Sequence, residues 1–394
     1  MIVVQCLKSS VFLLLFSLGM ACSVVVDAGA AQYVVTPSLS LQETYDDNVF
    51  LKEIDDFEHL ISPGLDFDVR TERAELKAGG AWDISDYQRH SELDSVDQTY
   101  ELSASVTPSE LWRLDFSGEY KDDYTFTSTL EESGIIADRS RRKRATLEPG
   151  VAVVLDPRNT LEFSYDFTKT QYDLERYPDY RVHGPNLTWI HGLMNERTSI
   201  ICSGGATVAD FEETSGDLNV RQRTYRGLAG IDHRFSETLQ LTLMAGASYT
   251  ESKLPRAGLS VEERDTGLIV DSTLEWRFER LSLSANVNRD ITPSIYGENV
   301  TRDRVRAGLR YRLTEKLRSG LSVSYYHSET DGLVEDEKRL TYSVRPSMIY
   351  RCTENVDLRL GYAYTWTENE ITDYSQERNR FFLELAVAWP KTFD

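Results

Sequence analysis

Four arginines stand at even spacings within one short segment of the chain. They are Arg304, Arg306, Arg310 and Arg312, and the residues between them are apolar or small. On a β-strand, residues two apart face the same side, so this spacing predicts a single row of guanidinium groups. Fixed cations along the wall of a water-filled pore would attract and orient anions, including carboxylated or phosphorylated sugars. We therefore treat these four arginines as possible pore-lining residues.

Further arginines are expected to share this face on neighbouring strands, namely Arg318, Arg339, Arg345, Arg351 and Arg359. An alternative is that all of them pair with carboxylates across the strands, for example with Glu275, Asp271, Asp357 and Glu384, and only stiffen the wall. Both interpretations fit the spacing.

The sequence contains no recognisable motif for catalysis, metal binding or haem attachment. The six histidines have no spacing typical of metal sites, and no Gly-x-Ser-x-Gly, phosphate-binding glycine loop, CxxC or CxxCH occurs. We predict no catalytic residue, no cofactor and no metal, so the chain is not expected to be an enzyme. Cys202 and Cys352 lie about seven predicted strands apart, and no disulfide is expected between them.

The elements that must position these residues follow from an alternation of apolar and polar side chains between Tyr33 and Trp389. A period of two predicts β-strands with one apolar and one polar face. About eighteen strands are expected. They begin near Tyr33, Glu58, Arg73, Gln98, Leu111, Arg142, Thr160, Arg181, Arg197, Gln222, Leu239, Arg264, Leu281, Arg304, Leu317, Arg339, Val356 and Arg378.

Short turns alternate with long polar links between these strands, which is typical of an outer-membrane β-barrel. The fold class is therefore all-β: a transmembrane, antiparallel, up-and-down barrel with short periplasmic turns and long acidic extracellular loops. The acidic clusters, such as Asp46-Asp47 and Asp55-Asp56, are expected to be solvated. A soluble all-β protein is the alternative. Five prolines inside predicted strands should cause bulges or local breaks, and these are Pro37, Pro63, Pro149, Pro185 and Pro346.

The N-terminus predicts export. Lys8 precedes an apolar run, and Ala28-Gly29-Ala30 offers small residues for cleavage, so residues 1–30 are interpreted as a cleaved signal peptide. Acylation at Cys22 is the alternative. Residues 31–394 then form one barrel domain in the outer membrane of a Gram-negative bacterium. The expected partners are lipid, lipopolysaccharide and the barrel-assembly machinery, whereas a net charge of -21 argues against nucleic acid.

The first predicted strand leads into Tyr45-Asp46-Asp47-Asn48-Val49-Phe50-Leu51. This phrase resembles a family of outer-membrane β-barrels found beside exopolysaccharide and PEP-CTERM sorting loci, as do His59 to Leu65 and the closing Arg378-Asn379-Arg380. The resemblance implies a channel for export of an exopolysaccharide, with the polysaccharide and periplasmic export components as partners, or for passage of solutes. The alternative is a sheath that holds a multihaem cytochrome partner in its lumen.

Overall fold

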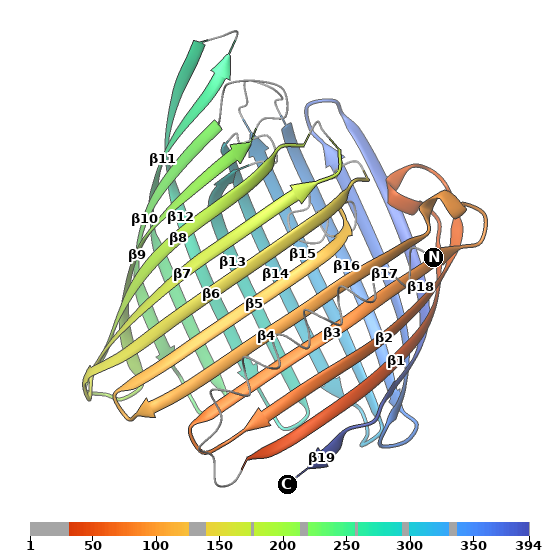
Figure 1. Cartoon of the computed structure of the whole chain (residues 1–394), viewed down its shortest axis with the longest axis horizontal. Helices are drawn as coiled ribbons and strands as arrows, with labels where there is room; N and C mark the ends of the chain where they lie inside the picture. Colours follow the sequence, from red (N-terminus) through yellow and green to blue (C-terminus); the bar gives the residue numbers. More distant parts are fainter. Residues whose placement is uncertain are drawn as a thin grey trace.

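The chain folds into one closed antiparallel β-barrel (Figure 1). The computed structural model describes residues 31–393 apart from 126–138, 175–176, 213–219, 257–258, 294–298 and 331–336. Each long strand pairs with its neighbours in sequence, and the barrel closes where residues 38–46 of the first strand pair with residues 380–388 of the last. The predicted up-and-down barrel of 18 strands is confirmed.

The strand boundaries agree with the alternation in the sequence, since every expected start lies within five residues of an observed one. The strands are β1 (Gln32–Asp46), β2 (Asp56–Arg70), β3 (Ala74–Tyr87), β4 (Ser95–Ser109), β5 (Trp112–Tyr124), β6 (Arg141–Asp156), β7 (Asn159–Tyr172), β8 (Asp179–Gly192), β9 (Thr198–Glu212), β10 (Val220–Arg234), β11 (Leu239–Arg256), β12 (Leu259–Arg277), β13 (Leu281–Pro293), β14 (Asn299–Arg312), β15 (Leu317–Thr330), β16 (Glu337–Arg351), β17 (Val356–Asn369) and β18 (Tyr374–Ala388). A short β19 (Lys391–Phe393) continues β18 beside the start of β1.

The two ends of the barrel differ in their connections. The start of β1, the strand β19 and the short turns share one end, and the longer connections lie at the other (Figure 1). Two single-turn helices, η1 (Val49–Leu51) and η2 (Ser91–Leu93), belong to the long connections. The expected signal peptide and most of the longest loop, residues 126–138, fall outside the described residues.

The five strand prolines cause local breaks without bulges. At each of them the pairing to one neighbour lapses for two residues and then resumes in the same register, for example between Ile61 and Gly64 along β2. Pairing to the other neighbour continues, as where Leu39 faces Pro63. The reason is that the N–H and C=O of one residue point to the same neighbouring strand, so a missing proline N–H weakens only one ladder. The eighteen strands therefore survive.

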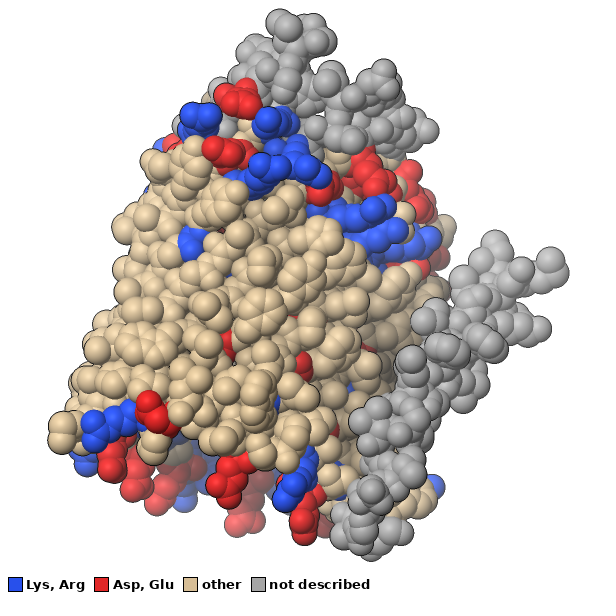
Figure 2. Space-filling model, turned by 60° about the vertical axis from the view of Figure 1, so that its left-hand side comes forward, with Lys and Arg blue, Asp and Glu red and all other residues tan. Residues whose placement is uncertain are grey.

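The outer surface carries the apolar half of the alternation. Large hydrophobic side chains such as Leu243, Phe163 and Leu360 are exposed there, and Figure 2 shows an almost uncharged band between two charged rims. Trp366 stacks on Tyr342, with ring centroids 4.7 Å apart, near the rim of the long connections. An apolar band with aromatic residues at its border matches a lipid-facing surface. Among the described residues, no helix is long and apolar enough to cross a membrane.

Adjacent residues on β7 allow a matched test of the two faces. Phe163 is exposed on the outer face, whereas the register places Ser164 on the inner face, between Gly150 on β6 and Asn186 on β8. Phe163→Arg should impair assembly, because it places a charge against lipid, which destabilises the folded barrel by about 2–4 kcal/mol near the midplane. Ser164→Arg, next to Glu162 and Asp166 on the inner face, should assemble normally. Heat-modifiability on gels gives the folded fraction, and equal behaviour of the two variants would contradict the assignment of faces.

The native Cys352 tests the orientation, because it is exposed in the turn between β16 and β17. In intact cells, a membrane-impermeant maleimide should leave Cys352 unlabelled, since short turns face the periplasm. It should label a cysteine introduced at Thr372, an exposed residue of the opposite end, in a Cys352→Ser background. Labelling of Cys352 in intact cells would invert the topology.

Candidate functional site

The inner wall of the barrel is the candidate site, and the four arginines singled out in the sequence all belong to it. They project from β14, whose register places Arg304 opposite Asn288 on β13 and Tyr326 on β15. Because alternate residues share a face, Arg306, Arg310 and Arg312 lie on the same side as Arg304. The wall also includes the other arginines that the alternation predicts on β15, β16 and β17.

Two of the four arginines are held by neighbouring side chains. Arg304 pairs with Asp290 and donates a hydrogen bond to the Asn288 side chain at 2.7 Å. The Nε of Arg306 donates to the Tyr326 hydroxyl at 2.9 Å, and its guanidinium lies 5.4 Å from the centre of that ring. Both head groups are therefore oriented by the wall itself.

The other two differ from each other. Arg312 donates to the backbone carbonyl of Glu279 at 2.7 Å, in the turn before β13. Arg310 is exposed, and no carboxylate among the described residues lies within ion-pair distance of it. The pairing and pore-lining interpretations thus each apply to part of the row, and a role of these arginines in a conducting pore stays a prediction.

The carboxylates expected to neutralise these arginines do so only in part. Glu384 pairs with Arg359 at 3.1 Å, and Asp357 lies 3.6 Å from Arg318. Glu275 instead pairs with Arg277 on its own strand. The partner of Arg304, Asp290, was not among the residues anticipated, because it lies at the far end of a strand whose inner residues are otherwise uncharged.

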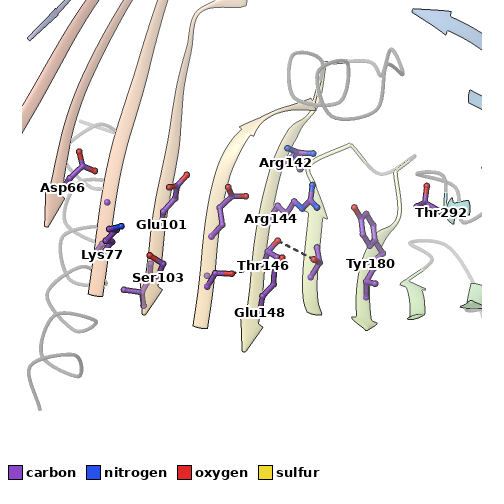
Figure 3. Close-up of a pocket in the computed structure, with 18 of the residues that line it drawn as sticks. Asp66, Lys77, Glu101, Ser103, Arg142, Arg144, Thr146, Glu148, Tyr180 and Thr292 are labelled. Atoms are coloured by element: carbon purple, nitrogen blue, oxygen red, sulfur yellow. Dashed lines mark hydrogen bonds between the residues drawn. The ribbon is translucent and has the colours of Figure 1, made fainter. Parts of the chain in front are cut away.

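A cavity of about 1090 Å³ lies inside the barrel and is lined from both walls. On one side its lining comes from β1 to β9, and on the other from β13 and β14, including Arg304 and Arg306. In Figure 3, Asp66, Lys77 and Glu101 project into it from neighbouring strands. Of the 25 lining residues, 19 are charged or carry hydroxyl groups, which suits hydrated cargo.

The wall formed by β2 to β5 is acidic, and the sequence analysis missed it. Asp66, Glu101 and Glu119 follow one another around the barrel, with Gly79 between the first two. A side chain at Gly79 would meet the Asp66 carboxylate at 2.7 Å, so glycine leaves room for that carboxylate over β3. The alternation already places these carboxylates on the polar face of their strands. They are far apart in sequence, so their proximity in the barrel was not recognised.

Cations compensate this wall only in part, although Lys77, Arg142 and Arg144 line the same cavity. Lys121 lies 2.9 Å from Glu119, and Ser117 donates to Glu148 at 3.1 Å. For Asp66 and Glu101, no basic side chain in the described part of the chain comes within ion-pair distance. This wall therefore keeps an excess of negative charge.

The wall from β14 to β18 is basic, and only β1 separates its last strand from β2. Its register places an arginine-rich set inward, consisting of Arg302, Arg304, Arg306, Arg310, Arg312, Arg318, Arg339, Arg345, Arg351, Arg359, Arg378 and Arg380. Among the side chains that the structure describes on these strands, only Asp357 and Glu384 add inward carboxylates. The lumen thus has one acidic sector and one basic sector.

The lumen also differs along its axis. Inward side chains near the long connections are packed, as for Thr250 on β11 and Thr367 on β17, which are 0% and 2% exposed. Inward residues nearer the short turns are open, as for Ser322 and Arg345. The inward side chains are therefore more tightly packed on the side predicted to be extracellular.

The phrase that carries the family resemblance has a structural role at the seam, the pairing of β1 with β18. Arg378 forms a two-pronged ion pair with Asp46, at 2.5 and 2.9 Å, and both side chains are buried. Asn379 donates to Asp47 through its backbone and its side chain, at 2.6 and 2.7 Å. The side chain of Asn48 donates to the carbonyl of Glu377 at 2.6 Å. The two motifs are therefore partners of each other.

The next three residues complete this arrangement. Val49, Phe50 and Leu51 are buried and pack with Tyr87 and Leu93. Phe50 and Leu51 have positive φ, a conformation that costs residues with a Cβ about 1–3 kcal/mol each. Buried apolar contacts and the hydrogen bonds of the seam hold the segment in this shape.

Two acidic residues expected to be solvated are buried instead. Asp46 belongs to the seam, and Asp56 accepts hydrogen bonds from the backbone N–H groups of Phe57, Arg89 and His90. The expectation of solvated clusters was wrong here, because hydrogen bonds from several donors offset the loss of hydration of a buried carboxylate. Asp55, the neighbour of Asp56, remains exposed and pairs with Arg89 at 2.8 Å.

The seam yields a stability prediction. Asp46→Asn keeps the side-chain shape but leaves Arg378 buried without its counter-charge, so the folded barrel should lose about 3–5 kcal/mol. The measurement is the temperature at which the folded form on gels converts to the unfolded form. Asp55→Asn, which breaks an exposed pair, is the control and should shift it little. An equal shift in both variants would contradict a structural role of the seam.

No metal or disulfide site emerges from the described residues. They contain no group of three or more His, Cys, Asp or Glu side chains placed to hold a metal ion. Cys202 and Cys352 are free, as expected from their separation.

Comparison with known proteins supports the fold. Residues 224–389 match the family model described as "Putative beta-barrel porin 2". No curated protein sequence matches the chain significantly. The ferric citrate transporter FecA is similar in structure, with a TM-score of 0.50 and 13% identity over 86% of this chain and 60% of that one. The copper transporter OprC is also similar, with a TM-score of 0.51 and 11% identity over 88% of this chain and 62% of that one. The chain thus spans about 60% of the length of these transporters, and in fold it is a porin-like outer-membrane β-barrel.

Proposed function

We propose that the protein is an outer-membrane channel through which hydrophilic solutes cross. The observation that carries this proposal is the cavity of about 1090 Å³ within the barrel, lined from both walls by charged and hydroxyl side chains. A barrel of this strand number leaves a lumen wider than its own side chains fill. A polar lumen inside an apolar outer band is the arrangement that passes water-soluble cargo.

For the cargo, we propose an exported exopolysaccharide or its sugar units. The resemblance of the Tyr45 to Leu51 phrase to barrels beside exopolysaccharide loci motivates this choice. The lining supports it, because hydroxyl groups and carboxylates are the partners that sugar hydroxyls use, and Ser103, Ser117, Thr146 and Thr168 line the cavity beside Glu101 and Glu148. The packed side chains near the long connections would make that end the narrowest point of the path.

Planar-bilayer recording tests the channel. The purified protein should give stepwise conductance, and a neutral oligosaccharide added on one side should interrupt the current as it occupies the lumen. A preparation of Phe163→Arg, which should fail to assemble, is the control. A folded protein that never conducts would refute the channel, and a stoichiometric haem-staining partner in the same preparation would favour the sheath.

A further inference from the structure

The two walls of the lumen carry opposite charge and border the same cavity. Asp66 and Glu101 enter its lining from β2 and β4, and Arg304 and Arg306 enter it from β14. The acidic excess continues along β5, whereas β6 adds Arg142 and Arg144 beside Glu148, and the basic excess continues along β15 to β18. The cavity lining from β1 to β9 has five carboxylates against three basic side chains, and the lining from β14 has three arginines. A solute in this cavity therefore lies between a surface of net negative charge and a surface of positive charge.

The charges are held in place on at least one side. Arg304 is fixed by Asp290 and Asn288, and Arg306 by the hydroxyl and ring of Tyr326. Side chains that are already oriented do not need to reorganise when a solute arrives, so their field acts on it in full. A low-dielectric barrel wall concentrates such a field within the lumen.

Different solutes respond differently to such a field. A neutral sugar gains little from it, a cation is attracted to one wall and repelled by the other, and an anion behaves in the opposite way. A molecule with separate positive and negative groups can align with the field and gain at both walls. We propose that the lumen favours zwitterionic solutes, such as α-amino acids or sugar units that bear both an amine and a carboxylate. This inference rests on the proposed channel function.

Efflux from proteoliposomes that contain the full-length protein tests the inference. The probes are four radiolabelled solutes of similar size: arabinose as the neutral reference, glutamine as the zwitterion, lysine and glutamate. At low salt, glutamine should leave about twofold faster than arabinose, since a unit charge several ångströms from a fixed charge in water gains about 0.5 kcal/mol. In 1 M KCl, where the Debye length is about 3 Å, the difference should vanish.

Two lumen variants and two controls locate the effect. Asp66→Asn with Glu101→Gln should slow lysine and glutamine relative to arabinose by about twofold. Arg306→Gln with Arg310→Gln should slow glutamate and glutamine in the same way. Glu237→Gln removes one negative charge and Lys316→Gln removes one positive charge, both at exposed short turns outside the lumen. Each should leave the ratios unchanged.

The outcomes separate the two proposals. If arabinose does not leave, the channel itself is refuted, and the selectivity with it. If arabinose leaves and glutamine follows it at the same rate in all variants, the channel stands and the charge-separated lumen has no role in selection. If only one double variant slows glutamine, one wall acts alone and the two-wall proposal is wrong.

Discussion

The closure of the sheet is the constraint on which the rest of the structure depends. In lipid, an unpaired strand edge would leave a row of N–H and C=O groups without hydrogen-bond partners, so only a closed barrel is stable. Closure requires β1 to find β18 at the other end of the chain. The ion pair between Asp46 and Arg378, which are 332 positions apart, and the bonds from Asn379 to Asp47 reinforce that pairing. A phrase that reads as an acidic loop thus stabilises the seam.

Once the barrel is closed, alternate residues of each strand face lipid on the outside and water on the inside. The middle band of the outer face meets lipid and bears apolar side chains with almost no charge, whereas the inner face meets water and bears charged side chains. The inner charges are distributed by strand, with an excess of carboxylates from β2 to β5 and of arginines from β14 to β18. Because each strand contributes its own row to the wall, a difference in composition between the two ends of the chain becomes a difference between sectors of the lumen.

The sequence was sufficient for features that repeat along the chain. Strand number, turn lengths and the facing of residues such as Leu243 follow from a period of two, which survives without tertiary information. The burial of Asp46 and Asp56 could not be predicted, because it depends on partners contributed by distant strands and loops. Arg304 illustrates the same limit: its spacing placed it on the inner wall, but its partner Asp290 depends on the register between β13 and β14. The prolines were anticipated as breaks, and the one-sided orientation of backbone groups explains why the strands continue.

A cross-link at the seam tests the closed barrel most directly. Ser40 on β1 faces Ala386 on β18, and the hydrogen bonds of Trp389 to Pro37 and Asp47 to Asn379 make this a non-hydrogen-bonded pair, whose side chains come closest. Cysteines at both positions should form a disulfide in the assembled protein, visible as a shift on non-reducing gels. Cysteines at Ser40 and Glu384, one pair out of register, should form far less. Failure of the first pair to cross-link in folded protein, or equal cross-linking of both, would contradict an eighteen-stranded barrel closed by β1 and β18.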